Sequence, residues 1–412
     1  MEQRKITIVT STRADWGLLR PLAAALRSRN DVVLSIIATN MHLDPAYGYT
    51  VSEIEADGFR VDARVPMTTE AVAKAFGDEA DVNFASDDTA AAGSAPDSAM
   101  HTVEATAVGM AGVARAFARL RPDMVIILGA RYEMLAVATA ATIMRLPIVH
   151  IAGGEISEGA FDDSIRHAIT KLSALHLTAT EQYRQRVISM GEDPSRVVNT
   201  GAIGVYNLLK ETPMSKAELE ESIGLPIDRR TLLVTLHPAT MDDAPASRRI
   251  LALTQALDVF PDSRVIFTYP NNDPDGRIII REIEAYVARN PHRCVAIPSL
   301  GWKRYLSALR YVGAVVGNSS SGIVEVPSTG IPTVDIGIRQ RGRMASESVI
   351  HCGPDATSII PAIREALSGQ GQQRARRAEN PYAKPDTLQI MVEAIMASDP
   401  ATLRSKRFID HF

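Results

Sequence analysis

The sequence predicts an α/β protein with two domains, each built on a parallel sheet, that face each other across a cleft. Short apolar, β-branched runs recur along the 412 residues and alternate with stretches of helical periodicity. The alternation pauses between Asn207 and Arg230 and then resumes, which divides the chain into two parts. Hydrophobic residues make up 46% of the chain and charged residues 22%, a balance that can fill two cores.

The first part, residues 1–206, has the pattern of a Rossmann-like domain. Strands are expected at Ile6–Thr10, Val32–Ala38, Met124–Leu128, Pro147–Ile151, Leu175–Thr178 and Val197–Thr200. Helices are expected over Leu18–Leu26, from near Tyr132, and over Asp162–Ser173. Residues Gly77–Ser98 are acidic and alanine-rich without a clear period, so we expect a mobile loop there.

The second part, residues 207–380, repeats the pattern. Ser215 and Glu218 fit a capping box and Gly224 a helix stop, which predicts one short helix at the boundary. Strands are expected at Thr231–Leu236, Val265–Tyr269, Val295–Ile297, Ala314–Val316 and Thr333–Ile336, with helices over Arg248–Val259, Arg277–Arg289 and Trp302–Leu309. Gly369–Asn380 is expected to be a polar linker. Thr387–Met396 is a last amphipathic helix, and residues 381–412 are expected to pack back on the first domain.

Composition excludes several classes of protein. The net charge of -4 shows no basic excess, so we expect no nucleic-acid partner. Only Cys294 and Cys352 occur, which argues against a disulfide framework or a cysteine-rich zinc site. The N-terminus runs directly into a strand rather than a signal peptide, and the apolar run Met134–Met144 is too short to span a membrane. We expect a cytoplasmic soluble protein with no membrane partner.

The stretch Gly317–Ser328 has the features of an anion-binding turn. It follows an expected strand and precedes a segment of helical character, so backbone N–H groups gather where a phosphate can approach. Glu325 lies about one helical turn further on, within reach of a group attached to that phosphate, such as a ribose. No Gly-Lys-Ser/Thr ending is present, so this is not a Walker A loop. An ordinary serine-capped helix is the alternative.

Polar residues also follow most of the other expected strands, where ligands of parallel sheets bind. These positions are Arg13 and Asp15, His42 and Asp44, Ala130 and Arg131, Glu155 and Asp162, His237, Asn271 to Asp273, and Asn318 to Ser321. Arg13 suits a pyrophosphate, or is a surface ion-pair partner. His237 is either structural or a donor to a leaving phosphate oxygen. The run Gly337–Arg343 either forms a solvated turn or places guanidinium groups beside the anion.

Glu155, Asp162 and Asp163 form an acidic set in the first domain. Carboxylates that face a cleft can act as general acid and base. The alternative for Asp162 and Asp163 is a helix N-cap, and we expect one of the two to serve as one. His150 and His176 lie in expected strands and are interpreted as core residues. No spacing suggests a metal site or a Gly-x-Ser-x-Gly nucleophile.

Several of these segments resemble the hydrolysing UDP-N-acetylglucosamine 2-epimerases. The matching segments are Ser11–Gly17, Gly129–Glu133, His150–Glu155, Asp162–Lys171, Tyr269–Asp273, Gly317–Ser328 and Arg339–Arg343. The resemblance implies the two-domain GT-B fold and a UDP-sugar substrate. It also implies elimination of UDP with loss of the sugar C2 proton, followed by addition of water. No cofactor or metal is expected. The chain is expected to form a homodimer or homotetramer.

By this resemblance, Asp162 matches a catalytic carboxylate, and Glu155 and His237 join it in the catalytic set. Arg13, Ser319, Ser320 and Glu325 would bind the UDP phosphates and ribose, and the loop from Ser299 would flank the base. The remaining expected substrate contacts are Asp15, His42, Asp163, Arg166, His167, Asn272, Asn318, Ser321, Arg339 and Arg343.

Two positions depart from the family pattern. Ala130 stands where the family usually carries a catalytically important Asp, and Ala152 where Glu or His is frequent. Ala130 is interpreted as a disabling substitution, so that the chain binds substrate but hardly turns it over. The alternatives left open are a sister 2-epimerase acting on UDP-2,4-diacetamido-2,4,6-trideoxyglucose, a GT-B glycosyltransferase and a catalytically silent nucleotide-sugar sensor.

Overall fold

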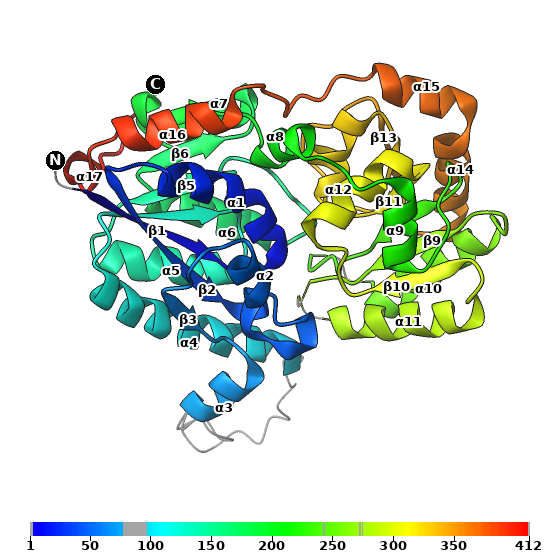
Figure 1. The fold of residues 1–412 in the computed structure, drawn as a ribbon, viewed down its shortest axis with the longest axis horizontal. Helices are drawn as coiled ribbons and strands as arrows, with labels where there is room; N and C mark the ends of the chain where they lie inside the picture. The colour runs from blue at the N-terminus through cyan, green and yellow to red at the C-terminus, as the bar shows by residue number, and fades with distance from the viewer. Residues whose placement is uncertain (1–2, 77–96, 242–243, 272, 274, 411–412) are drawn as a thin grey trace, which may run out of the picture.

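Two α/β domains stand side by side in the computed structural model (Figure 1), which describes residues 3–76, 97–241, 244–271, 273 and 275–410. The first domain contains a seven-stranded sheet and the second a six-stranded sheet. Within the described residues, the strand pairs of both sheets are all parallel. The predicted fold class, two Rossmann-like parallel-sheet domains, is confirmed.

The first sheet has the strand order β3-β2-β1-β4-β5-β6-β7. Its strands are β1 (Arg4–Thr10), β2 (Val32–Thr39), β3 (Ala63–Val65), β4 (Met124–Leu128), β5 (Ile148–Ile151), β6 (Leu175–Thr178) and β7 (Val197–Asn199). The helices of this part are α1 (Arg13–Arg27), α2 (Val51–Ala56), α3 (Thr69–Phe76), α4 (Asp97–Leu120), α5 (Tyr132–Ile143), α6 (Asp162–Leu172), α7 (Glu181–Ser189) and α8 (Ile203–Lys210).

The second sheet has the order β10-β9-β8-β11-β12-β13. Its strands are β8 (Leu232–Thr235), β9 (Val265–Thr268), β10 (Cys294–Ile297), β11 (Ala314–Gly317), β12 (Thr333–Ile336) and β13 (Val349–Cys352). The helices from the boundary onward are α9 (Lys216–Ile223), α10 (Ala246–Asp258), α11 (Gly276–Arg289), α12 (Gly301–Tyr311), α13 (Ser321–Val324), α14 (Ala356–Leu367), α15 (Gly369–Arg377), α16 (Thr387–Ala397) and α17 (Pro400–Leu403).

Each sheet is buried on both faces, which is why its strands read as continuous apolar runs. In the first sheet, Ile6 and Ile8 of β1 belong to one core cluster, while Val9 of the same strand belongs to another. In the second sheet, Leu232 and Val234 of β8 lie in one cluster and Leu233 in a different one. Because successive side chains of a strand point to opposite faces, each sheet has a separate core on each of its faces.

The chain returns to the first domain after α15, as the red α16 in Figure 1 shows. Met391 and Ile395 of α16 are fully buried in the same cluster as Ile6. The Arg4 guanidinium donates to the carbonyl of Ile395 at 2.8 Å. The division of the chain into residues 1–206 and 207–380 remains a proposal.

One expectation about local structure is wrong, one is confirmed with a shorter helix, and one falls largely outside the described residues. Gly369–Asn380 is not simply a linker, because Gly369–Arg377 forms α15, with Ser368 accepting from the Gly371 N–H as the cap and Ala375 buried. The helix expected after Gly317 is only the single turn α13, followed by a 3₁₀ turn, Val326–Thr329. Of the expected loop Gly77–Ser98, residues 77–96 lie outside the described residues, and Asp97 and Ser98 begin α4.

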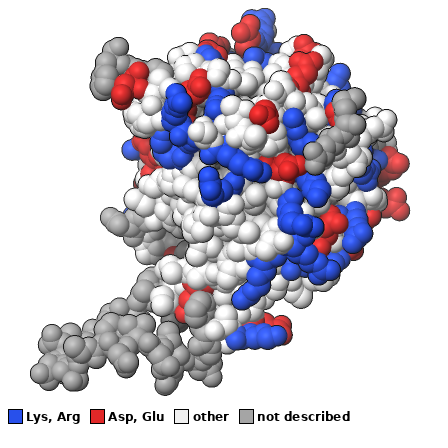
Figure 2. All heavy atoms as spheres, turned by 90° about the vertical axis from the view of Figure 1, so that its left-hand side faces the viewer, with Lys and Arg blue, Asp and Glu red and all other residues white. Residues whose placement is uncertain are grey.

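Figure 2 shows the outer end of the first domain, where Lys and Arg side chains lie among Asp and Glu side chains and uncharged surface. Charges of both signs therefore share this face. No helix within the described part of the chain combines the length and apolar character needed to cross a membrane.

Candidate active site

Two adjoining cavities lie where the domains meet, at the carboxyl ends of the strands. Cavity A, of about 220 Å³, is lined mostly by the first domain, and cavity B, of about 250 Å³, mostly by the second. Both are lined by Ala14, Leu18, Asn271, Ser320, Glu325 and Arg339. The domains touch beside them, since the Glu158 N–H donates to the Arg341 carbonyl at 3.2 Å. The geometry is therefore that of one cleft with two compartments.

Glu155 and Asp162 line cavity A, as do the carboxylate residues Asp15 and Glu325. The Glu155 Oε2 atom is 2.6 Å from Nη1 of Arg343, and Asp162 Oδ2 is 4.0 Å from Nη2 of Arg339. Burial, and then repulsion by the Asp273 carboxylate, raise the pKa of Asp162. A raised pKa favours the protonated carboxyl, which is the form that donates a proton.

Asp163 takes a different role from Asp162. Its Oδ1 accepts a hydrogen bond from the Ser157 N–H at 2.5 Å, and its other oxygen is 3.6 Å from the His167 ring. The expectation that Asp162 or Asp163 caps α6 is wrong, because Phe161 occupies the N-cap without a side-chain bond and both aspartates lie in the first turn. Asp163 therefore orders the loop before α6.

Besides Arg131, three arginines line cavity A: Arg166, Arg339 and Arg343. Arg166 donates to Ser157 Oγ at 2.9 Å, and Arg339 to the Asn318 carbonyl at 3.1 Å. The Nε atoms of all three are buried without a partner among the described residues. Because Arg339 and Arg343 are buried, the solvated-turn interpretation of Gly337–Arg343 is wrong for these two side chains. The guanidinium groups leave donors available to an acceptor-rich ligand.

His237 lines cavity B just beyond β8. Its Nδ1 accepts from the Asn271 N–H at 3.3 Å, which leaves the proton of a neutral ring on Nε2. Burial, and then the positive charge of Arg339, lower the pKa of His237 to about 3. The ring is therefore a neutral hydrogen-bond donor at neutral pH.

The turn after β11 supplies the hydroxyls of Ser319, Ser320 and Ser321 to cavity B. Gly317 has φ of +141°, and an added Cβ there would lie 1.8 Å from the Thr235 carbonyl oxygen, so only glycine fits. Asn318 does not line either cavity. Its side chain instead accepts from the His237 N–H at 2.7 Å and donates to the His237 carbonyl at 2.8 Å. Asn318 thereby fixes the backbone that carries the histidine.

Glu325 lies at the junction of the two cavities and is partly buried. Burial raises the pKa of Glu325 to about 7. An added Cβ on Gly204 would lie 2.1 Å from its Oε1 atom, so the carboxyl packs directly against the start of α8. Nearby, Tyr305 and Ser321 share a hydroxyl hydrogen bond of 2.5 Å.

Arg13 and Ser299 both line cavity B. Arg13 comes from the first domain, and its Nη2 donates to the Pro298 carbonyl of the second at 3.0 Å. Burial lowers the pKa of Arg13 to about 10, which still leaves the guanidinium charged at neutral pH. The Ser299 hydroxyl accepts at 2.9 Å from the N–H of Gly301, the first residue of α12.

Several predicted contact residues lie away from the cavities or face inward. Asp15 lines cavity A, but its carboxylate accepts from the Ser11 hydroxyl at 2.7 Å and closes a capping box with Thr12. His42 is fully buried outside both cavities, and its ring nitrogens contact Thr10 and Thr50 hydroxyls. Asp163, His167 and Asn318 also line neither cavity, and Asn272 lies outside the described residues.

Alanine methyl groups form part of the wall of cavity A. Ala130, 4% exposed, follows β4, and Ala152 follows β5. Ala152 has φ of +65°, a left-handed conformation that costs a non-glycine residue about 1 kcal/mol. At both positions the cavity meets a group that can neither move a proton nor form a hydrogen bond.

Arg131 and Asp273 were given no role by the sequence, although both follow strands. Arg131 Nη1 is 3.1 Å from Asp273 Oδ1, and its Nε is 3.1 Å from Glu133. The two residues belong to different domains. The sequence signalled them only by their position after a strand and by the family-like segments Gly129–Glu133 and Tyr269–Asp273. Gln340, which donates to the Asn318 carbonyl at 2.8 Å, was missed in the same way.

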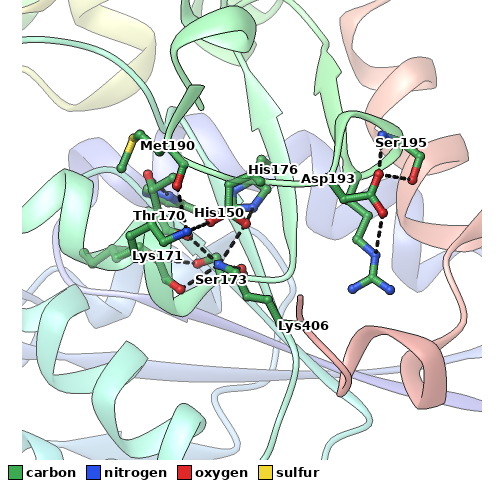
Figure 3. A network of polar contacts seen from close by, with 12 residues as sticks. His150, Thr170, Lys171, Ser173, His176, Met190, Asp193, Ser195 and Lys406 are labelled. Carbon is green, nitrogen blue, oxygen red and sulfur yellow. Dashed lines mark hydrogen bonds and ion pairs between the residues drawn. The ribbon is translucent and has the colours of Figure 1, made fainter. Parts of the chain in front are cut away.

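A polar network holds the far end of α6 (Figure 3). Lys406, from the C-terminal segment, donates to the carbonyls of Lys171 at 2.6 Å and Ser173 at 2.7 Å. Its ammonium also lies 2.8 Å from Glu192, which accepts from His176 at 3.0 Å. His150 and His176 are fully buried in β5 and β6, so their interpretation as core residues is confirmed. The network fixes the helix whose first turn carries Asp162.

Among the described residues, no group of three or more His, Cys, Asp or Glu side chains is arranged to hold a metal ion.

The sequence profile described as UDP-N-acetylglucosamine 2-epimerase matches residues 24–396. The GDP/UDP-N,N'-diacetylbacillosamine 2-epimerase (hydrolyzing) of Campylobacter jejuni is 36% identical over 350 residues, 85% of this chain and 84% of its own. The polysialic acid biosynthesis protein P7 of Escherichia coli is 33% identical over 386 residues, 93% of this chain and 92% of its own. The crystal structure of UDP-GlcNAc 2-epimerase from Neisseria meningitidis bound to UDP-GlcNAc gives a TM-score of 0.74 at 16% identity, covering 96% of this chain and 100% of that chain. At that identity the likeness shows the fold.

Proposed function

This chain belongs to the UDP-N-acetylglucosamine 2-epimerase family, and from that premise we propose that it is a hydrolysing 2-epimerase of a UDP-linked N-acetylhexosamine. The reaction converts UDP-N-acetylglucosamine to N-acetylmannosamine and UDP, for sialic or nonulosonic acid biosynthesis. A cytoplasmic site of action and a homodimer or homotetramer belong to the same proposal.

The junction of the two cavities is the observation that carries this proposal. Cavity A offers the carboxylates Glu155 and Asp162, while cavity B offers serine hydroxyls, His237 and Arg13. Carboxylates suit proton transfer at a sugar carbon, and hydroxyl, imidazole and guanidinium donors suit phosphates. This division supports a ligand with a sugar at one end and a nucleoside diphosphate at the other.

The chemistry fits two acid–base groups and an anion site. A base removes the proton from sugar C2, the electron pair forms the C1–C2 double bond, and the C1–O bond breaks to release UDP. The neutral His237 donates a hydrogen bond to the departing phosphate, whose negative charge the nearby Arg13 stabilises. Water then adds its oxygen to C1, while a proton is delivered to C2 from the opposite face.

The sugar itself has two candidates. The family name favours UDP-N-acetylglucosamine. The Campylobacter jejuni relative favours the sister substrate UDP-2,4-diacetamido-2,4,6-trideoxyglucose, because its name specifies diacetylbacillosamine. The two differ at sugar C4 and C6.

The deciding experiment offers both UDP-sugars to the purified protein and to Ala130→Asp without any acceptor. We expect UDP and the free 2-epimerised sugar, with deuterium at C2 when the reaction runs in deuterated water. UDP release that requires an added acceptor would instead identify a GT-B glycosyltransferase. Tight binding of a UDP-sugar by both proteins, with no release of UDP from either, would identify a nucleotide-sugar sensor.

A further inference from the structure

An ion pair crosses the cleft beside cavity A. Arg131, just after β4 in the first domain, reaches Asp273, just after β9 in the second, at 3.1 Å. The side chains are 13% and 6% exposed, so both charges are nearly removed from water. A buried carboxylate held by a guanidinium stays ionised, and it acts strongly on neighbouring charges because little water screens it.

Asp162 is the neighbour on which Asp273 acts. Arg131, which holds Asp273, lines cavity A together with Asp162, Arg166 and Arg339. Arg339 lies 4.0 Å from Asp162. The charges that act on the pKa of Asp162 are those of Asp273, Arg339, Arg131 and Arg166, and Asp273 is the only carboxylate among these four. Arg131 and Arg339 also act on the pKa of Asp273.

The surroundings of the two aspartates shift their pKa values in opposite directions. Burial, followed by repulsion from Asp273, raises the pKa of Asp162. Burial alone would also raise the pKa of Asp273, but the positive charges of Arg131 and Arg339 lower it. When the pKa values of two carboxyl groups are shifted in this way, one group can donate a proton and the other stays ionised.

Inversion at sugar C2 requires two different groups, because the proton leaves from one face and returns on the other. We propose that Asp273 is a positioning residue of this reaction: fixed by Arg131 across the cleft, its carboxylate makes Asp162 the group that gives its proton to C2. Asp162 lines cavity A, whereas Asp273 lines neither cavity and so acts through Asp162.

In this step, water bonds to C1 as the C1–C2 pair takes the proton from Asp162. The base that removed the first C2 proton passes that proton to the departing UDP, and it is then free to accept the proton that water loses. The inference rests on the proposed function for this step. The electrostatic part rests on the structure alone, so it can be measured without turnover.

The test is a carbon-13 NMR titration of protein labelled at the aspartate carboxyl carbons, with the Asp162 signal identified by its loss in Asp162→Asn. Asp273→Asn is expected to lower the Asp162 midpoint by about one pH unit, the scale of a like charge at short range. Asp275→Asn is the matched control, since Asp275 is exposed in the same loop and caps α11 without a side-chain bond. Asp275→Asn is expected to leave the midpoint unchanged.

An unchanged midpoint in folded Asp273→Asn, or an equal fall in Asp275→Asn, overturns the proposal. Should Asp273→Asn fail to fold, Asp273→Glu keeps the charge: a midpoint that stays raised supports the proposal, and a fall to the ordinary aspartate range overturns it. In turnover, Asp273→Asn is expected to release UDP while the unsaturated sugar accumulates; full conversion to the hydrated sugar at the original rate overturns the C2 step. Absence of UDP release from any UDP-sugar by the unmodified chain and by Ala130→Asp instead defeats the proposed function, and leaves the titration result standing.

Discussion

The carboxylate of Glu155 lies 2.6 Å from the guanidinium of Arg343, and this contact joins the two domains inside the cleft. Each side chain is only 7% exposed. Taking two charges out of water costs free energy that their attraction offsets only while both are present. The pair therefore stabilises the contact between the two domains. Removing one partner leaves the other charge buried and unpaired, which destabilises the protein.

We predict that Glu155→Gln and Arg343→Met each lower the free energy of unfolding by about 3 kcal/mol, because each leaves a buried charge unpaired. The double variant should lose much less than the sum, since it removes both charges. Urea unfolding of the four proteins of this cycle measures the coupling. Glu158→Gln, exposed in the same loop, is the control and should change little. Additive losses would show that the two side chains do not interact in solution.

The sheets could be predicted because their strands are buried on both faces. Met124–Leu128 was predicted with the bounds that the structure shows, since all five residues are buried and apolar. Short edge strands gave no such signal: β3 has only three residues, of which one is buried. The polar helix α15 was missed because little of its sequence is apolar, and its packing against α14 is a tertiary effect.

The sequence could predict those residues of the site that follow the ends of strands. Glu155, Asp162, His237 and Ser319 follow strands and line the cavities. The Arg131–Asp273 pair was not predictable, because it depends on how two domains are placed relative to each other. His42 is the opposite case, because it follows a strand but lines neither cavity, and both its ring nitrogens contact hydroxyl groups of its own domain.

Glu192 gives a prediction about acid. Burial alone would raise the pKa of Glu192, but hydrogen bonds from His176, Lys171 and Lys406 lower it to about 2. Because the folded pKa lies below the ordinary value of about 4.5, this carboxylate stabilises the fold above pH 4.5, and the contribution is lost as the pH falls toward 2.

Glu192→Gln should therefore lose about 2 kcal/mol of stability at pH 7, after allowance for solvent screening, and much less near pH 3. Urea midpoints at the two pH values test this. Glu221→Gln, at an exposed position, is the control and should follow the wild type at both. An equal loss at pH 7 and pH 3 would contradict the ionised network around Lys406.

Glu325 should show the opposite pH dependence. Its folded pKa of about 7 lies above its ordinary value of 4.5, because the carboxyl is buried. Between pH 4.5 and pH 7 the unfolded chain releases this proton while the folded protein retains it, so stability falls as the pH rises through that range. The loss approaches about 3 kcal/mol, since each pKa unit corresponds to about 1.4 kcal/mol. Glu325→Gln cannot ionise, and its stability should decline less over the same range. Parallel curves for the two proteins in urea unfolding at pH 5, 6 and 7 would show that Glu325 is ionised when folded.

Ala130 gives the last prediction, because its methyl group lines cavity A at the end of β4, beside Arg131. A carboxylate at this position can move a proton or hold a sugar hydroxyl, and a methyl group can do neither. Ala130→Asp should raise turnover of a UDP-sugar by about a hundredfold or more, the scale of a general acid or base. The affinity for UDP should stay nearly unchanged, because the residues proposed for the nucleotide line cavity B. Coupled assay of UDP release and calorimetry of UDP binding measure the two quantities. Ala130→Asn is the matched control, since it adds the same bulk without an ionisable group and should stay slow. An Ala130→Asp protein no faster than Ala130→Asn would rule out a carboxylate role at this position and favour the silent sensor.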